Sequence, residues 1–290
     1  VNIASAPTGL LIPPSGILII YALVSGGTSV SALFMAGYLP GILWGLAVMI
    51  TAYFIAKKNN YPVAEKISFS DKVKVFLEAI PSLMLIVVVI GGITIGIFTA
   101  TEGAAIAVAY CFILSFFFYK SITLKDMPQI LLESGKMTAV IMLLIGASSV
   151  MSWIMAYTNI PNLITNLLLG ISSSKIVILL IMNIMLLIVG TFMDLTPAVL
   201  IFTPILLPIA KNFGMDPIHF GIMLITNLAI GNITPPVGSA LFIGCKVGNT
   251  RIEEVMKYLM PFYIAIIVVL MLVTFVPDVS LIIPKLLGLI

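Results

Sequence analysis

The stretch GNITPPVGSALFIG, residues 231–244, places Pro235 and Pro236 in the middle of a long apolar segment. A proline has no backbone N–H to donate, and Pro235 also disfavours helical geometry at Thr234. The segment therefore cannot form one regular helix. Carbonyls freed before the break are available to a cation, and the helix N-terminus after it favours an anion. A kink that serves packing alone is the competing interpretation.

The composition around this break requires a membrane. Of 290 residues, 61% are hydrophobic and only 9% are charged, with a mean hydropathy of +1.25. A water-soluble domain carries about 25% charged residues. A run of about 20 apolar residues spans a bilayer as a helix, which pairs its own backbone groups in lipid. We therefore predict an all-α polytopic membrane protein in a lipid bilayer. The apolar segments lie at about 1–25, 34–56, 79–98, 103–119, 137–157, 174–210, 217–247 and 258–276.

Positive charge gathers in three polar connections, and this sets the orientation. Residues 57–76, 119–136 and 246–257 hold eleven of the fourteen Lys and Arg residues. Cytoplasmic connections are enriched in these residues, so all three are predicted to be cytoplasmic. Segment 174–210 then begins and ends outside, which predicts a re-entrant hairpin with its tip near Asp194. Irregular backbone at that depth is tolerated where it is buried in protein or lines a cavity.

The Pro-Pro break occurs twice in the chain. An offset of 222 residues aligns the first copy, residues 9–28, with the second copy, residues 231–250. The identities are Gly9/Gly231, Pro13/Pro235, Pro14/Pro236, Gly16/Gly238, Gly26/Gly248 and Thr28/Thr250. The predicted topology runs the first copy outward and the second inward. Inverted repeats with discontinuous helices are characteristic of secondary transporters, which bind substrate near the membrane midplane. Channels and membrane enzymes also contain broken helices.

Asp194 and the oxygen-bearing side chains near the second break are the candidate site residues. A carboxylate inside a membrane segment is costly and indicates function. No Lys or Arg lies between Lys175 and Lys211, so we predict Na⁺ as the partner of Asp194, with a proton as the rival. Capping of the next helix is the competing role for this carboxylate. Oxygen ligands suit a hard cation, and Thr226, Asn227 and Thr234 supply them.

Two other features are assigned from the residues alone. Thr99 and Glu102 have the spacing of a helix capping box, so structural capping is predicted for this pair. The chain has one histidine, His219, and no paired carboxylates within an apolar segment. We therefore predict that the protein is not an enzyme.

Four stretches resemble signature sequences of the large membrane subunit of TRAP transporters, which are tripartite secondary transporters dependent on a periplasmic binding protein. The stretches are GLLIPPSGILIIY (9–21), GIFTATEGAAIAVAY (96–110), GTFMDLTPAVLIFTPILLPI (190–209) and GNITPPVGSALFIG (231–244). They occur in the family's order, and the resemblance covers essentially the whole chain. The chain departs from the family at Ala100, where a proline is usual. The family's first hairpin, with a Ser-rich tip, would precede Val1, so an N-terminal part is expected to be missing.

The resemblance implies a fold similar to the divalent-anion/Na⁺ symporters, in which a transport domain moves like an elevator against a scaffold. Residues 1–25 and 174–250 would form the transport domain, each holding one broken helix. Residues 26–173 would supply scaffold and connecting helices, including a cytoplasmic amphipathic linker at 57–78. Residues 251–290 would add a terminal scaffold helix and tail.

The resemblance also implies one Na⁺ site at each pair of hairpin tip and broken helix. The predicted Na⁺ ligands, with Asn227 added from the residues alone, are Gly9, Ile12, Gly190, Asp194, Thr226, Asn227, Gly231 and Thr234. The substrate is predicted to bind at Pro13, Pro14, Ser15, Thr196, Pro235 and Pro236. The site of the first copy is only half present, because its partner hairpin would precede Val1.

The predicted function is Na⁺-coupled uptake of an organic acid anion, such as a sialic acid, a C4-dicarboxylate or a 2-keto acid, across the bacterial inner membrane. The predicted partners are a periplasmic substrate-binding protein and a small membrane subunit, with no nucleic acid. The alternative is a stand-alone divalent-anion/Na⁺ symporter that needs no binding protein. A passive channel is a further alternative, and it predicts no accumulation against a gradient.

Overall fold

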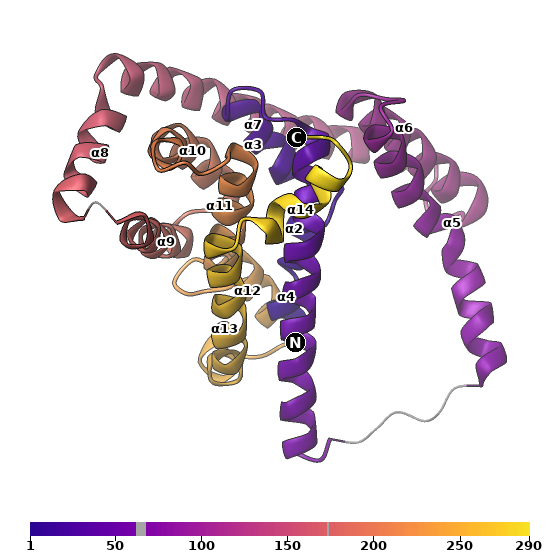
Figure 1. Ribbon diagram of the computed structural model, residues 1–290. Helices are drawn as coiled ribbons and strands as arrows, with labels where there is room; N and C mark the ends of the chain where they lie inside the picture. The colour runs from indigo at the N-terminus through magenta and orange to yellow at the C-terminus, as the bar shows by residue number, and fades with distance from the viewer. Residues whose placement is uncertain (62–67, 173) are drawn as a thin grey trace. The chain divides into compact units, whose positions relative to one another are not determined.

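The computed structural model describes residues 1–61, 68–172 and 174–290, and all regular structure in these residues is helical (Figure 1). The helices are α1 (Asn2–Ser5), α2 (Thr8–Leu11), α3 (Gly16–Val24), α4 (Val30–Lys58), α5 (Phe69–Thr94), α6 (Ala100–Ile113), the π-helix η1 (Leu114–Phe118), α7 (Met127–Tyr157), α8 (Ile160–Ile171), α9 (Lys175–Phe192), α10 (Leu195–Asn212), α11 (Pro217–Gly231), α12 (Ser239–Val247), α13 (Ile252–Phe275) and α14 (Asp278–Leu286). Within the described ranges, seven helices are long and apolar enough to cross a membrane, or up to eight if the bent pair formed by α1–α2 and α3 is one span. The predicted all-α polytopic class is confirmed.

Helix starts follow the local sequence. The Thr99 side chain accepts a hydrogen bond from the Glu102 N–H, and the Glu102 carboxylate accepts one from the Thr99 N–H at 2.8 Å. The predicted capping box is thus present at the start of α6. At α11 the Asp216 carboxylate accepts from the Ile218 N–H at 2.7 Å, and Pro217 occupies the first turn, where its missing donor costs nothing.

The chain packs into two compact units. One consists of Val1–Lys58 with Leu144–Ile290, and the other of Asn59–Leu143. The first unit holds both broken helices and the hairpin, together with α4 and α13, which the sequence analysis placed in the scaffold. Compactness does not show which elements move, so the predicted division of the chain stays a prediction. Residues 62–67 of the predicted linker 57–78 lie outside the described residues.

Helix α11 is the centre of the first unit (Figure 1). Every residue from Ile218 to Gly231 is buried, and the helix packs against α4, α9, α10 and α13. Two of its polar side chains, Thr226 and Asn227, are fully buried and therefore face protein. A polar group in such a position requires partners inside the protein, because lipid supplies none.

The two broken helices cross each other in a reciprocal way. The half before the first break, α1, packs on α12 after the second break, with Ile3 against Gly244. The half after the first break, α3, packs on α11, where Tyr21 covers Gly221 and its hydroxyl donates to the Pro217 carbonyl at 2.6 Å. In each copy, α1 in the first and α11 in the second, a helix before the break thus packs on the helix after the break of the other copy, while α2 also packs on α11. Such exchange is what two copies related by a pseudo-twofold axis would make. Both Pro-Pro peptide bonds are cis.

Helix α4 holds the first broken helix at very close range. A Cβ atom on Gly37 would lie 2.1 Å from the Leu11 carbonyl oxygen, and one on Gly41 would lie 2.4 Å from the Ile12 side chain. Small residues four apart allow this backbone approach between membrane helices. The Trp44 indole N–H donates to the Ala4 carbonyl at 2.8 Å. The first break is therefore packed as one body with α4.

Candidate functional site

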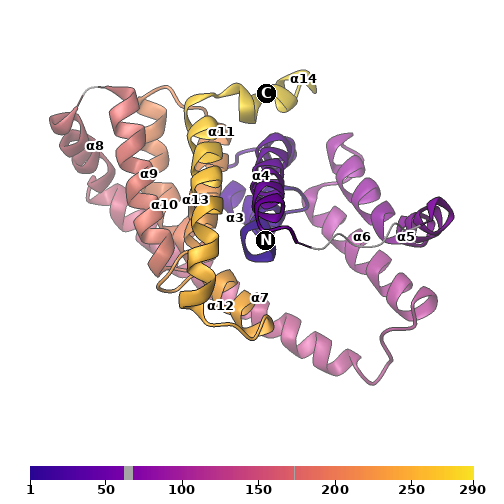
Figure 2. The same cartoon turned by 90° about the horizontal axis from the view of Figure 1, so that it is seen from below.

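The hairpin consists of α9 and α10, which run side by side and are separated only by Met193 and Asp194 (Figure 2). Both residues are extended, with ψ of 145° and 155°, so the chain leaves helical geometry at this point. The turn lies where the sequence analysis put the tip. Each arm has 18 residues and is apolar enough to span a membrane by itself. The re-entrant depth of the hairpin stays a prediction.

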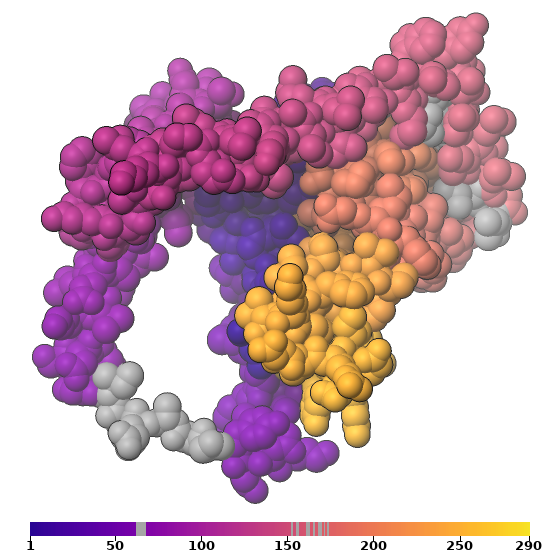
Figure 3. Space-filling model, turned by 180° about the vertical axis from the view of Figure 1, so that it is seen from behind, coloured from indigo at the N-terminus to yellow at the C-terminus, as the bar shows by residue number. Residues whose placement is uncertain are grey.

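The end of α9 meets the end of α11 backbone to backbone. A Cβ atom on Gly231 would lie 2.3 Å from the Gly190 carbonyl carbon and 2.5 Å from its oxygen. Beyond the break, the Val237 N–H donates to the Thr191 carbonyl at 3.0 Å. In the space-filling view of Figure 3 the orange tones, from the hairpin to α12, form one continuous surface. The predicted pairing of hairpin tip and second break is thus a direct contact.

Polar side chains of the tip and the break converge at Ser239, the first residue of α12. Its hydroxyl donates to the Asn232 side-chain oxygen at 2.5 Å, and the same hydroxyl oxygen lies 3.4 Å from the Asp194 carboxylate. The Asp194 side chain is exposed and accepts no hydrogen bond from a backbone N–H of α10. Helix capping therefore does not account for Asp194. A carboxylate, an amide oxygen and a hydroxyl at one place are oxygen ligands suited to a hard cation.

Asn232 and Ser239 were missed by the sequence analysis. Both lie inside the quoted stretch 231–244, on either side of the Pro-Pro pair. An apolar pattern does not tell which polar residues around a break turn toward each other. The available signal was position, because Ser239 opens the helix that follows the break.

The carbonyls of the second break are less free than the sequence suggested. Tyr263 of α13 donates its hydroxyl to the Ile233 carbonyl at 2.5 Å. The other carbonyls from residue 230 to 234 each accept at least one backbone or hydroxyl hydrogen bond. The Ile230 carbonyl accepts from the Ile233 N–H and the Thr234 hydroxyl, and the Gly231 carbonyl accepts from the Thr234 N–H. The Asn232 carbonyl accepts from the Ala240 N–H, and the Thr234 carbonyl accepts from the Gly238 N–H. A carbonyl oxygen has two lone pairs, so one remains on each singly bonded oxygen for a cation.

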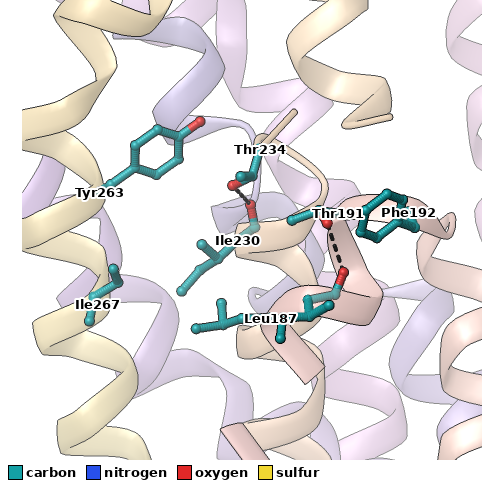
Figure 4. A pocket seen from close by; sticks show the side chains of 8 residues that line it. Leu187, Thr191, Phe192, Ile230, Thr234, Tyr263 and Ile267 are labelled. Atoms are coloured by element: carbon teal, nitrogen blue, oxygen red, sulfur yellow. Dashed lines mark hydrogen bonds between the residues drawn. The ribbon is translucent and has the colours of Figure 1, made fainter. Parts of the chain in front are cut away.

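A cavity of about 330 Å³ lies beside the break, between α9 and α13 (Figure 4). Its walls are mostly apolar, with Leu187 and Phe192 from α9, Ile230 from α11 and Ile267 from α13. The hydroxyls of its two threonines are turned to carbonyls of their own segments: Thr191 donates to Ile188 and Thr234 to Ile230, both at 2.7 Å. The hydroxyl of the predicted ligand Thr234 thus donates its proton within its own segment. This cavity is too apolar to hold a carboxylate substrate.

The remaining predicted residues lie in three surroundings. Thr226 donates to the Ile222 carbonyl at 2.6 Å inside α11, and Asn227 donates to Asn183 of the hairpin. At the first break, the Ser15 hydroxyl donates to the Leu10 carbonyl at 2.6 Å. The further predicted residues of the first break are Gly9, Ile12, Pro13 and Pro14, and those of the second region are Thr196, Pro235 and Pro236. Helix α2, just before the first break, packs against α11. These ligand assignments stay predictions.

Tyr263→Phe tests the link between α13 and the break. The variant keeps the ring and loses only the hydroxyl that holds the Ile233 carbonyl, a loss of about 1 kcal/mol. We expect uptake to fall about three- to tenfold at unchanged expression. Tyr258→Phe is the control, because Tyr258 lies on the same helix and is 63% exposed. Uptake by Tyr263→Phe equal to that of Tyr258→Phe would show that the hydroxyl does not support the site.

The fold and the site define a multi-pass α-helical membrane protein with two broken helices that pack on each other and a hairpin that packs against both of them. The sequence matches the family model described as "Tripartite ATP-independent periplasmic transporter, DctM component" over residues 1–279. The chain belongs to this family. It is therefore a component of a transporter and not an enzyme, and its location is the bacterial inner membrane.

The relatives include two proteins named as TRAP transporter large permeases. The chain is 51% identical over 99% of its length to "Uncharacterized protein YgiK" of Salmonella typhimurium, covering 66% of that protein. It is 40% identical over 98% of its length to the C4-dicarboxylate TRAP transporter large permease protein DctM of Rhodobacter capsulatus, covering 68%. It is likewise 40% identical over 98% to the sialic acid TRAP transporter large permease protein SiaM of Vibrio cholerae, covering 66%. The chain thus spans about two thirds of the length of these relatives.

Proposed function

We propose that this chain forms the ion- and substrate-binding part of a secondary transporter. A Na⁺ gradient drives the uptake of an organic acid anion by this transporter. The observation that carries the proposal is the convergence of Asp194, Asn232 and Ser239 where the hairpin tip meets the second break. Discontinuous helices in secondary transporters coordinate Na⁺ with unwound backbone and bind anions with half-helix N-termini. The N-terminus of α12, at Ser239, is such an end.

The substrate class and the partners follow from the family. The relatives' names specify C4-dicarboxylates and sialic acid, both of which are carboxylates. We propose a carboxylate substrate for this chain as well, delivered by a periplasmic binding protein and carried with a small membrane subunit. The family's description as tripartite and periplasmic supports both partners.

For the elevator movement we propose one change to the domain division. The Leu11 carbonyl and Ile12 side chain fit against Gly37 and Gly41 without room for a Cβ atom, and Trp44 holds the Ala4 carbonyl. Interfaces packed this closely move as rigid bodies. If the first broken helix moves, α4 moves with it, and it belongs to the transport domain rather than to the scaffold.

The test is uptake of radiolabelled C4-dicarboxylate and sialic acid into vesicles holding the full-length transporter with its partner subunit. An inward Na⁺ gradient is expected to drive accumulation only when the loaded binding protein is present. Undiminished uptake without the binding protein would favour the stand-alone symporter. Equilibration without accumulation would favour a passive channel, and uptake driven by a proton gradient without Na⁺ would replace the coupling ion.

A further inference from the structure

A buried chain of amide hydrogen bonds joins the hairpin to the central helix. Asn183 of α9 is 1% exposed and Asn227 of α11 is fully buried. The Asn227 amide nitrogen donates to the Asn183 side-chain oxygen at 2.7 Å and to the Asn183 backbone carbonyl at 3.0 Å. Thr274 of α13 lies beside Asn183, with its hydroxyl 3.2 Å from the amide nitrogen. Three helices thus meet at Asn183.

The direction of both amides is fixed by backbone carbonyls, which can only accept. The Asn183 amide nitrogen faces the Leu179 carbonyl at 2.8 Å, so its oxygen must face Asn227. The atom of Asn227 that faces the Asn183 carbonyl must in turn be its nitrogen. Rotating either amide by 180° would oppose two acceptors. The side-chain oxygen of Asn227 is therefore turned away from Asn183.

That oxygen is the unpaired end of the chain. In the described part of the protein, the Asn227 side-chain oxygen is buried and has no hydrogen-bond partner. A buried acceptor left unpaired costs about 1–3 kcal/mol, so native proteins seldom leave one without a ligand or water. Asn227 donates both of its amide protons to Asn183. This donation makes the side-chain oxygen of Asn227 a stronger acceptor. Asn227 lies one helical turn before Gly231, where the hairpin tip contacts α11.

Resting on the proposed Na⁺ coupling, we propose that Asn183 is a positioning residue that aims the Asn227 oxygen at a bound Na⁺, with Thr274 supporting Asn183. The hairpin arm α9 thereby contributes to ion affinity through a side chain remote from its tip. Amide and hydroxyl oxygens are suitable ligands and neighbours for a hard monovalent cation. The arm α9 also stays fixed to α11 while the ion is bound.

The test measures Na⁺ binding apart from transport. The full-length transporter is purified in detergent, and its thermal stability is followed as NaCl replaces KCl at constant ionic strength, which gives a Na⁺ half-saturation. Asn183→Leu keeps the side-chain size and removes the amide. We expect its half-saturation to rise about fivefold or more, as expected for about one lost hydrogen bond. Thr274→Val is expected to raise it about twofold, and Asn212→Ala, at an exposed position of α10, to leave it unchanged.

A double variant separates positioning from packing. If Asn183 acts through Asn227, then Asn183→Leu with Asn227→Ala together raise the half-saturation no more than Asn227→Ala alone. A purely structural Asn183 would lower the melting temperature without Na⁺ and leave the half-saturation within twofold of wild type, which would overturn the proposal. Wild-type protein without any Na⁺-dependent stabilisation would overturn it too. Na⁺ binding by a wild type whose uptake ignores Na⁺ would instead overturn the proposed function alone.

Discussion

Asp194→Ala is expected to reduce Na⁺-driven uptake by about 100-fold or more while membrane insertion stays normal. A carboxylate about 4 Å from a cation contributes about 4 kcal/mol at an effective dielectric constant of 20, and each 1.4 kcal/mol is a factor of ten. The structure leaves this carboxylate exposed beside Ser239 and unused by the backbone of α10. Its removal therefore changes ion binding more than folding.

Asp278→Ala is the matched control, because this carboxylate has a 68% exposed side chain and pairs with exposed Lys285. It is expected to transport like wild type. Asp194→Asn tests whether Na⁺ or a proton is the coupling ion, since the variant keeps the side-chain shape and one oxygen but removes the charge. Wild-type Na⁺ dependence in Asp194→Ala would exclude Asp194 from the ion site. A wild type driven by a proton gradient alone would instead make the proton the coupling ion.

The sequence could predict features that depend on local chemistry or on charge. The break at Pro235-Pro236 follows from two missing donors, and the turn near Asp194 follows from counting basic residues in the connections. It could not predict how the break is held. The donor to the Ile233 carbonyl is Tyr263, thirty positions away, and only the packing of α13 brings it there.

The pairing of Asn183 with Asn227 illustrates the same limit. A single asparagine in an apolar helix fits the helical pattern whether it faces a partner or not, and the sequence analysis did not single out Asn183. Asn227 was predicted from its position near the break, but as an isolated ligand. Its orientation depends on a helix that begins 52 positions earlier, at Lys175. Periodicity carries no information about such a pair.

Gly231→Ala is expected to abolish most uptake and to lower the melting temperature of the purified protein, because its Cβ would lie 2.3 Å from a backbone carbon of Gly190. Backbone cannot rotate away as a side chain does, so the hairpin tip must separate from the break. Overpacking of this kind costs about 1–3 kcal/mol, and here the strain falls on the site itself.

The two glycines of this contact are not equivalent, which gives the prediction a direction. A Cβ on Gly190 would be 3.2 Å from the nearest atom, the Gly231 Cα, and 3.4 Å from Leu228. The neighbouring atoms need to shift by a few tenths of an ångström to relieve that clash. In return, alanine stabilises a helix by about 1 kcal/mol relative to glycine. Gly190→Ala is thus expected to lose less than about threefold in uptake, whereas Gly231→Ala loses more than about tenfold. Gly146→Ala, with open space around its Cβ, is the control and should match wild type. Equal uptake by the Gly190 and Gly231 variants would mean that the tip and the break are not in backbone contact during transport.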